Sequence, residues 1–244
     1  MFEAFIWMFK KENFKKHYLI LICCSLLTNL TLILFLMGKI TSIISMAFAG
    51  LIMFITGLFL CGYFWNLTEN IIDAEADISA NTVYNGKIKT FLKIELPTLK
   101  IFKLIWRGFA SIIANILILI PYFLLIYLAN LSAAVKPSTL MLLPFIMLFY
   151  LLFFPALFWN YAKSNSVFAV LNITKAVYIM GNYPGRYIVK AFQLAVIYIL
   201  FTVLTVFLTN TTDMFVYIAI LPVAIYLTLV YAYILGTLVP NEEF

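Results

Sequence analysis

Six long apolar stretches divide this chain, and each meets or approaches the length that a helix needs to cross a lipid bilayer. A membrane-spanning helix takes about 20 predominantly apolar residues. The mean hydropathy of +1.07 and a charged fraction of 11% leave too little polar surface for a water-soluble fold. The sequence therefore predicts an integral membrane protein. The stretches cover residues 18–38, 41–65, 109–131, 139–162, 188–209 and 214–239.

These spans are expected to be helices. The bilayer core holds no water, so every backbone amide there must be satisfied within a helix or a closed barrel. Barrel strands would alternate apolar and polar residues over about ten positions, whereas residues 112–128 are apolar on all sides. The connections leave no room for a separate soluble domain. We therefore expect an all-α, polytopic transmembrane bundle of six helices that forms a single domain over residues 1–244.

Basic residues gather in alternate connections between the spans. The amino-terminal segment carries four, the connection after the second span six and the connection after the fourth span four, whereas the other side has only Lys39 and Lys136. Connections rich in Lys and Arg stay in the cytoplasm. The pattern predicts a multi-pass protein of the prokaryotic inner membrane with both termini cytoplasmic. The first span lacks a cleavage-site pattern, so we expect it to be retained.

The connection after the second span is amphipathic over residues 87–107. Basic side chains occupy one side of a helix there, and aromatic and aliphatic side chains fill the other. This pattern predicts an interfacial helix, interrupted at Pro97, whose cations meet anionic phospholipid headgroups. A helix docked on the inner rim of the bundle fits the pattern equally well. The predicted headgroup residues are Lys89, Lys93, Lys100, Lys103 and Arg107.

The connection after the fourth span has a related layout. We expect a short amphipathic interfacial helix over residues 167–180, capped by the polar residues 164–166 and ended by the Gly and Pro residues of 181–185. The tripeptide Phe-Trp-Asn ends both the second span and the fourth span, at 64–66 and 158–160. These features together suggest a parallel internal repeat, in which about 41–131 corresponds to 139–209.

One acidic pattern follows the second span. Asn70, Asp73 and Asp77 share one face of a helix, and their spacing resembles the first aspartate-rich motif of membrane prenyltransferases, which implies a magnesium–diphosphate site. That family needs a second acidic cluster on the same side. The acids after Glu95 are Asp213, on the predicted outer side, and two glutamates at the carboxyl terminus. The alternative is a patch that pairs with the basic helix, and we expect no catalytic residue, metal or cofactor.

Several short motifs are spread along the chain. They are the aromatic-and-lysine stretch from Phe9 to Lys16, Gly62-Tyr63, Leu96-Pro97, Gly108 and the Asn-x-Pro-Gly-x-Tyr sequence from Asn182 to Tyr187. Together they resemble a family of uncharacterised prokaryotic six-span membrane proteins, one of the domain-of-unknown-function groups. The resemblance covers most of the chain and implies a six-span fold, without indicating a reaction.

The sequence favours a non-enzymatic membrane protein that serves as an accessory subunit or a lipid-interacting scaffold. Proline-containing spans and the repeat favour, as an alternative, a permease-like transporter of a hydrophobic or uncharged solute. A prenyltransferase-like enzyme is a third reading. The expected partners are the bilayer with its anionic phospholipids and either another membrane protein or further copies of the chain. Nucleic acid is not expected, because the basic residues flank apolar spans.

Overall fold

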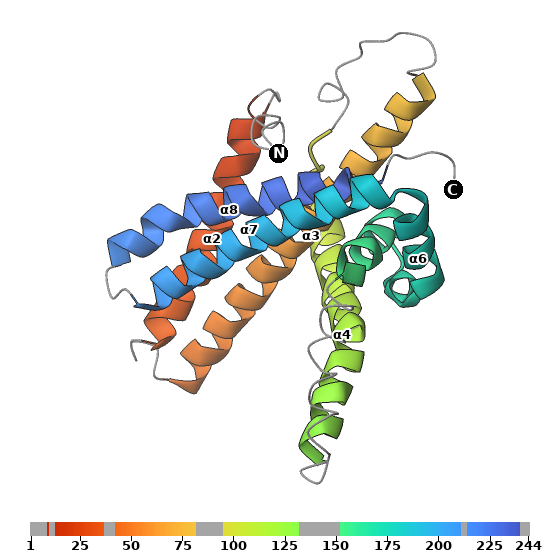
Figure 1. Cartoon of the computed structure of the whole chain (residues 1–244). Helices are drawn as coiled ribbons and strands as arrows, with labels where there is room; N and C mark the ends of the chain where they lie inside the picture. The colour runs from red at the N-terminus through yellow and green to blue at the C-terminus, as the bar shows by residue number, and fades with distance from the viewer. Residues whose placement is uncertain are drawn as a thin grey trace.

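The computed structural model describes Phe9 and residues 13–36, 42–81, 95–131, 152–210 and 214–239, and it is helical without strands over these residues (Figure 1). The all-α class is confirmed for this part of the chain. Residues 152–164 are helical as well, and the remaining elements are α2 (Phe14–Leu36), α3 (Ile43–Asn81), α4 (Ile101–Leu131), η3 (Val167–Leu171), α6 (Ile173–Asn182), α7 (Pro184–Asn210) and α8 (Met214–Gly236).

Four helices in the described ranges are long and apolar enough to cross a membrane. They agree with the prediction of a membrane protein, while the count of six spans and the orientation stay predictions. Part of the predicted fourth span, 139–151, lies outside the described residues. The four candidate segments are Ile43–Ala74, Ile101–Ile120, Pro184–Leu204 and Ala219–Gly236.

α3 extends well beyond the predicted second span. It has 39 residues, which at 1.5 Å per residue make a rod of about 58 Å, roughly twice the thickness of the hydrocarbon core. Residues 66–81, which include the acidic pattern, therefore continue the spanning helix instead of starting a connection. They stay helical because no Gly or Pro lies between Gly62 and Asn81.

The predicted interfacial helix at 87–107 is different in the structure. Residues 95–100 are irregular around Pro97, as expected, but α4 begins at Ile101 and runs without interruption to Leu131. Residues 101–107 are thus the first two turns of a spanning helix and not a separate in-plane helix. The physical reason is that the apolar face of this segment continues directly into the apolar residues of the span.

The predicted helix at 167–180 is divided in two. A short 3₁₀ helix, η3, comes first, and Asn172 then caps α6 by accepting a hydrogen bond from the Lys175 backbone N–H at 2.9 Å. Ser166 forms no side-chain cap, so the expected cap at 164–166 is wrong. The break before the fifth span is confirmed, because α6 ends at Asn182 and Pro184 opens α7.

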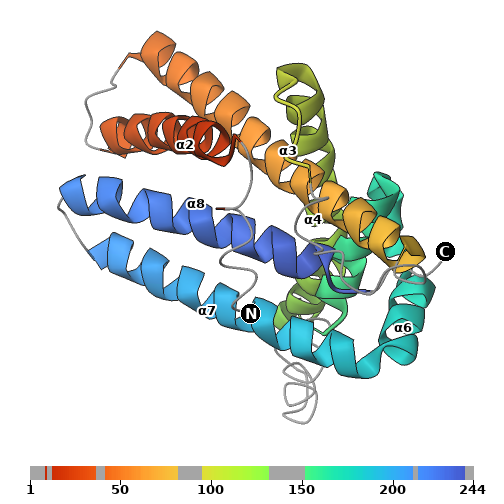
Figure 2. The same ribbon diagram turned by 90° about the horizontal axis from the view of Figure 1, so that it is seen from above.

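α2 runs beside α3 and α7 beside α8, and these helices meet α4 and the 152–164 helix in one region, which we call the converging end (Figures 1 and 2). α8 contacts α2, α3 and α7, and the Tyr18 hydroxyl of α2 donates a hydrogen bond to the Pro222 carbonyl oxygen of α8 at 2.7 Å. α4 crosses α3 and then leaves the group. At the crossing, a Cβ atom on Gly62 would overlap the Leu104 carbonyl, and one on Gly108 would overlap the Leu58 carbonyl. Glycine permits this close backbone approach.

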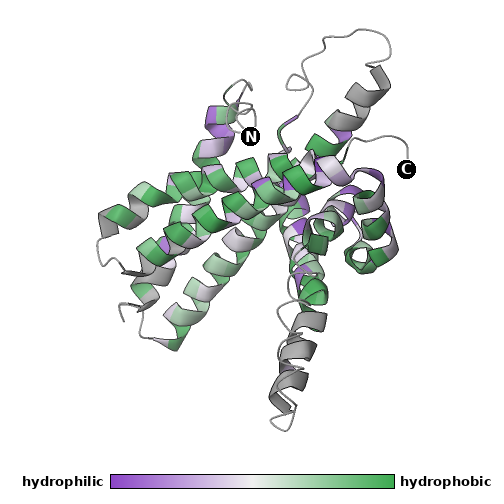
Figure 3. Cartoon of the chain, viewed as in Figure 1, coloured by the Kyte–Doolittle hydropathy of each residue, from purple (hydrophilic) through white to green (hydrophobic). Residues whose placement is uncertain are grey.

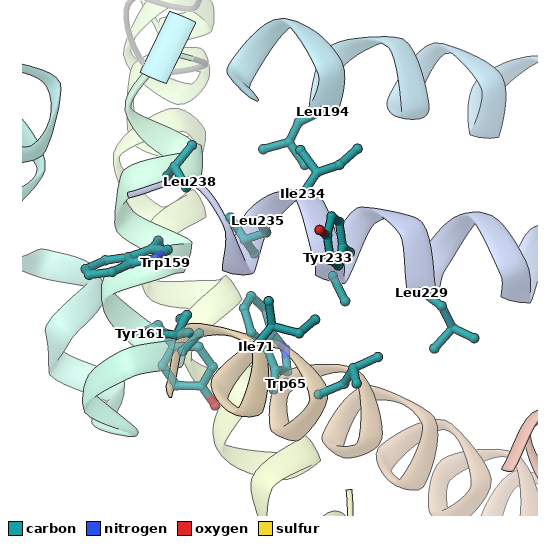
Figure 4. Close-up of a cluster of buried hydrophobic side chains, with 14 of the residues drawn as sticks. Trp65, Ile71, Trp159, Tyr161, Leu194, Leu229, Tyr233, Ile234, Leu235 and Leu238 are labelled. Atoms are coloured by element: carbon teal, nitrogen blue, oxygen red, sulfur yellow. The ribbon is translucent and has the colours of Figure 1, made fainter. Parts of the chain in front are cut away.

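The core lies at the converging end (Figure 4). Side chains of α3, the 152–164 helix, α7 and α8 meet there, and Trp159, Ile71 and Ile234 are almost completely buried. Hydrophilic residues gather at the same end (Figure 3), including the basic side chains of α2 and α7. At the other end of α3, Ile43 is 84% exposed. Most of the largest fully buried side chains therefore lie near the charged residues of the described chain.

We predict that Gly62→Ala lowers the thermal unfolding temperature, because the added methyl group must push α4 away from α3. Overpacking of this kind costs about 1–3 kcal/mol. The matched control is Gly57→Ala in the same helix, where a Cβ atom meets nothing within 4 Å and where alanine favours the helix. Differential scanning fluorimetry in detergent measures both. Equal unfolding temperatures for the two variants would contradict the close backbone contact between α3 and α4 at Gly62.

Candidate functional site

Arg107 occupies the centre of the converging end. It lies in the second turn of α4, beside the glycine crossing, and only 3% of the residue is exposed. Its Nη1 donates a hydrogen bond to Asn66 Oδ1 at 3.1 Å and forms an ion pair with the Glu69 carboxylate. Its Nη2 donates to the Ala162 carbonyl oxygen at 3.1 Å. One guanidinium therefore joins α3, α4 and the 152–164 helix. We call Arg107, Asn66 and Glu69 the arginine junction.

Helix geometry explains why Asn66 and Glu69 both reach the same guanidinium. Residues three apart lie on one face of a helix, and the glycine crossing brings that face of α3 against α4. The Asn66 Nδ2 group donates to the Gly62 carbonyl oxygen at 3.1 Å, which turns the Oδ1 atom toward Arg107. Gly62 thus has two roles. It lets α4 come close to α3, and its carbonyl oxygen helps to orient the Asn66 side chain toward Arg107.

Aromatic rings enclose the arginine junction. The ring of Trp65 lies 4.9 Å from that of Tyr161 and 5.5 Å from that of Phe158, measured between centroids. The Tyr161 hydroxyl donates to the Arg107 carbonyl oxygen at 3.5 Å. The two Phe-Trp-Asn tripeptides of the sequence therefore meet here, since Trp65 belongs to the first and Phe158 to the second. The internal repeat itself stays a prediction.

The arginine junction places opposite charges inside two candidate spans. Glu69 lies within Ile43–Ala74, and Arg107 lies within Ile101–Ile120. Charged groups at such positions must be paired, because desolvation of a single ion costs several kcal/mol. The Arg107 Nε atom is buried without a hydrogen-bond partner among the described residues. The guanidinium is thus mostly, but incompletely, satisfied by protein groups, and its chemical role is that of an electrostatic cross-link.

A second set of contacts joins the start of α7 to the end of α8. Arg186 donates from Nη2 to the Thr237 carbonyl oxygen at 2.9 Å, and Lys190 Nζ donates to Thr237 Oγ1 at 2.8 Å. Cations at this position satisfy a terminal carbonyl and oppose the negative end of the helix dipole. The basic residues at the start of α7 therefore fix the carboxyl end of α8.

The predicted headgroup residues separate into three groups. Arg107 was predicted at the lipid surface, but it is buried and paired, so this assignment is corrected. Arg107 is buried because Gly108, the next residue, lets α3 come close to α4 at this point. Lys100 and Lys103 are exposed, and Lys89 and Lys93 lie outside the described residues. The contact of these four lysines with headgroups stays a prediction.

The structure describes only part of the acidic pattern, so the magnesium–diphosphate site stays a prediction. Asn70 Nδ2 donates to the Glu95 carbonyl oxygen at 2.8 Å and so ties residue 95 to α3. Asp73 is exposed, whereas the side chain of Asp77 lies outside the described residues. Among the residues described, no three His, Cys, Asp or Glu side chains gather closely enough to hold a metal ion.

A lysine lies close to the acidic pattern. The Lys163 Nζ atom sits over the Trp159 ring, 5.1 Å from its centroid. Burial and the nearby charge of Lys175 lower the pKa of Lys163, while Asp73 opposes this shift. The Asp73 carboxylate is therefore near enough to a cation to support the alternative of an acidic patch that balances basic residues.

The sequence interpretation missed the arginine junction because it counted Arg107 with its exposed neighbours. A signal was present in the sequence: Asn66 and Glu69 are spaced for one helix face, and Arg107 directly precedes the glycine at the start of the predicted third span. Searches of protein-family models, curated proteins and solved structures found no match to this chain. The resemblance to six-span membrane proteins therefore stays a prediction.

We predict that Arg107→Met and Glu69→Leu each destabilise the fold, because each leaves the other charge buried and unpaired. Removing one partner of a buried pair costs about 3–5 kcal/mol; partial exposure of Glu69 puts its expected cost toward the lower end. The double variant should recover part of the loss, since an apolar pair needs no counter-charge. Unfolding in a denaturing detergent gives the double-mutant cycle.

The matched control is Lys103→Met, which removes an exposed cation from the same end of α4. Its unfolding midpoint should stay close to that of the parent. If Arg107→Met is as stable as Lys103→Met, or if the two junction losses simply add in the double variant, the guanidinium is not a cross-link.

Proposed function

We propose that this chain is a six-span protein of the prokaryotic inner membrane that acts, without catalysing a reaction, as an accessory subunit or lipid-interacting scaffold. Both termini and the converging end would face the cytoplasm. The observation that carries the proposal is the one-ended core. At the converging end the helices are cross-linked by charge and packed around aromatic rings, whereas away from it α4 diverges from the other helices and many apolar side chains lie on the surface.

The contrast is clearest along α3. Leu67 and Ile71 in its cytoplasmic half are fully buried, whereas Ile44 and Phe48 near its other end are 83% and 67% exposed. Surfaces of this kind are compatible with acyl chains, and they also offer lateral packing to the helices of another protein, because association in membranes depends on van der Waals fit. A protein that acts by holding lipid or a partner needs such a surface and needs no reactive group.

The cytoplasmic half supports the lipid part of the proposal. Lys100 and Lys103 are exposed beside Phe102 and Trp106, which are also strongly exposed. Aromatic rings favour the membrane–water boundary, and each cation near an anionic surface contributes about 1 kcal/mol. This arrangement at the start of α4 would hold the converging end at the headgroup layer.

The first test is native mass spectrometry of the full chain released gently from its own membrane. We expect the protein to retain a second polypeptide in fixed stoichiometry or an anionic phospholipid. An unaccompanied, monodisperse monomer would contradict both the subunit and the scaffold function. Retention of a neutral hydrophobic solute would favour the permease-like alternative.

A second test maps the contact surface. A photoreactive benzoylphenylalanine at Phe48 should cross-link to lipid or to the partner, because this side chain is exposed away from the converging end. The same group at Leu67, which is buried in the core, should react within the chain only. Cross-links to outside molecules from position 67, together with none from position 48, would place the interaction surface elsewhere.

A further inference from the structure

The connection between the 152–164 helix and α7 exposes an unusual amount of apolar surface. η3 and α6 make up most of it, and α6 lies across the end of α7 instead of continuing its direction (Figures 1 and 2). Large apolar side chains exposed to water are costly in such numbers. The side chains concerned, each more than half exposed, are Phe168, Leu171, Ile173, Val177 and Tyr178.

α6 has two distinct faces. Ala176 and Ile179 are fully buried against the bundle. Ile173 and Val177 lie one turn apart on the outer side, whereas Asn182 is exposed at the carboxyl end of the helix, about 140° around it from Val177. A short helix that is packed on one side and apolar along part of its outer side is typical of helices that lie in the plane of a membrane surface.

The position of α6 along the bundle places it at the bilayer boundary. α7 begins at Pro184, directly after α6, and its candidate span begins at the same residue. Ile188 and Phe192 of α7 are 65% and 70% exposed, so the apolar outer surface of the span starts within two turns of α6. The exposed side of α6 therefore continues a surface that already faces acyl chains, if the chain is oriented as proposed.

The positive charge around η3 and α6 indicates which kind of membrane surface they would bind. Lys163, Lys175, Arg186 and Lys190 all lie in or beside the connection, and no Asp or Glu occurs between residues 96 and 212. A surface of this charge is complementary to anionic headgroups. An acidic protein partner would meet the charges equally well, but it would not account for the continuity with the apolar stripe of α7.

We propose that η3 and α6 form an in-plane anchor, which inserts Phe168, Ile173 and Val177 into the boundary between headgroups and acyl chains of an anionic leaflet. This anchor rests on the membrane orientation given under the proposed function. It is a lipid-binding surface separate from the start of α4, and it involves none of the lysines assigned to headgroups from the sequence.

The test uses the full chain with Cys23, Cys24 and Cys61 changed to Ala, reconstituted in nanodiscs of equal parts phosphatidylglycerol and phosphatidylcholine. A nitroxide label is attached at Val177→Cys or Phe168→Cys, with Asn182→Cys, at the exposed polar end of α6 and off its apolar side, as the control. Power-saturation measurements compare collisions with oxygen, which enriches in acyl chains, and with a water-soluble nickel complex. We expect the oxygen-to-nickel ratio at positions 168 and 177 to exceed that at 182 several-fold.

Two results would overturn the anchor. Equal ratios at 168, 177 and 182, with strong nickel collisions, would mean that the face is in water. If labels at 168 and 177 collide with neither reagent, protein covers the apolar face of η3 and α6. A further label at Phe48→Cys separates this outcome from failure of the proposed function. Oxygen-rich collisions at 48 show that the part of α3 away from the converging end is in lipid, whereas nickel-rich collisions there would overturn the membrane placement and the anchor together.

A separate measurement tests whether the anchor needs anionic lipid. Lys175→Gln leaves the apolar face intact and removes one of the nearest cations. In phosphatidylglycerol nanodiscs, it should lower the oxygen-to-nickel ratio at 177, and in pure phosphatidylcholine the parent and Lys175→Gln should give the same ratio. An identical ratio for both proteins in phosphatidylglycerol as well would overturn the role assigned to charge.

Discussion

The backbone contact between α3 and α4 determines much of what surrounds it. Because Gly62 and Gly108 have no side chains, the two helices come close enough for the guanidinium of Arg107 to reach α3. In membranes, where apolar surface gives helices little reason to prefer one another over lipid, such close contacts supply the association energy. The buried charge then adds specificity, since Glu69 and Asn66 satisfy it only in one relative placement of the two helices. The close glycine contact and the need to pair the charge of Arg107 thus favour the same crossing of α3 and α4.

The rest of the molecule follows from having this cross-link at one end. The 152–164 helix is tied to the same guanidinium through Ala162, and α8 closes over α3 and α7 with its last turn held by Arg186 and Lys190. Away from this end, the described residues of α4 make no comparable polar contact with the other helices. The backbone groups in the interior of each helix are bonded within that helix, so α4 can diverge there without leaving them unsatisfied. The charged core and the divergence of α4 are therefore parts of one arrangement.

The sequence predicts the class of this structure well and its polar interior poorly. Hydropathy and helix length are local properties, so the helices near 18–38, 188–209 and 214–239 and the break at Gly181–Gly185 are visible in the residues themselves. Arg107 is different, because its burial depends on a glycine in α4 meeting a glycine in α3, and pairing between distant segments is not written in either segment alone. The length of α3 was missed for a related reason. Glu69 and Asp73 look like the start of a connection by composition, yet nothing between Gly62 and Asn81 ends a helix.

The hydrogen bond from Tyr18 to the Pro222 carbonyl joins residues that are 204 positions apart, and this separation has a consequence for biosynthesis. α2 and α3 are synthesised before α8, which contacts both. Until α8 is made, lipid or another protein has to cover the surfaces of α2 and α3 that α8 later contacts. Synthesis of the early helices and assembly of the core are then separate stages, and the second begins only when α8 arrives. A ribosome that stalls before α8 would leave correctly inserted helices without their core, in a form that quality-control proteases of the membrane could recognise.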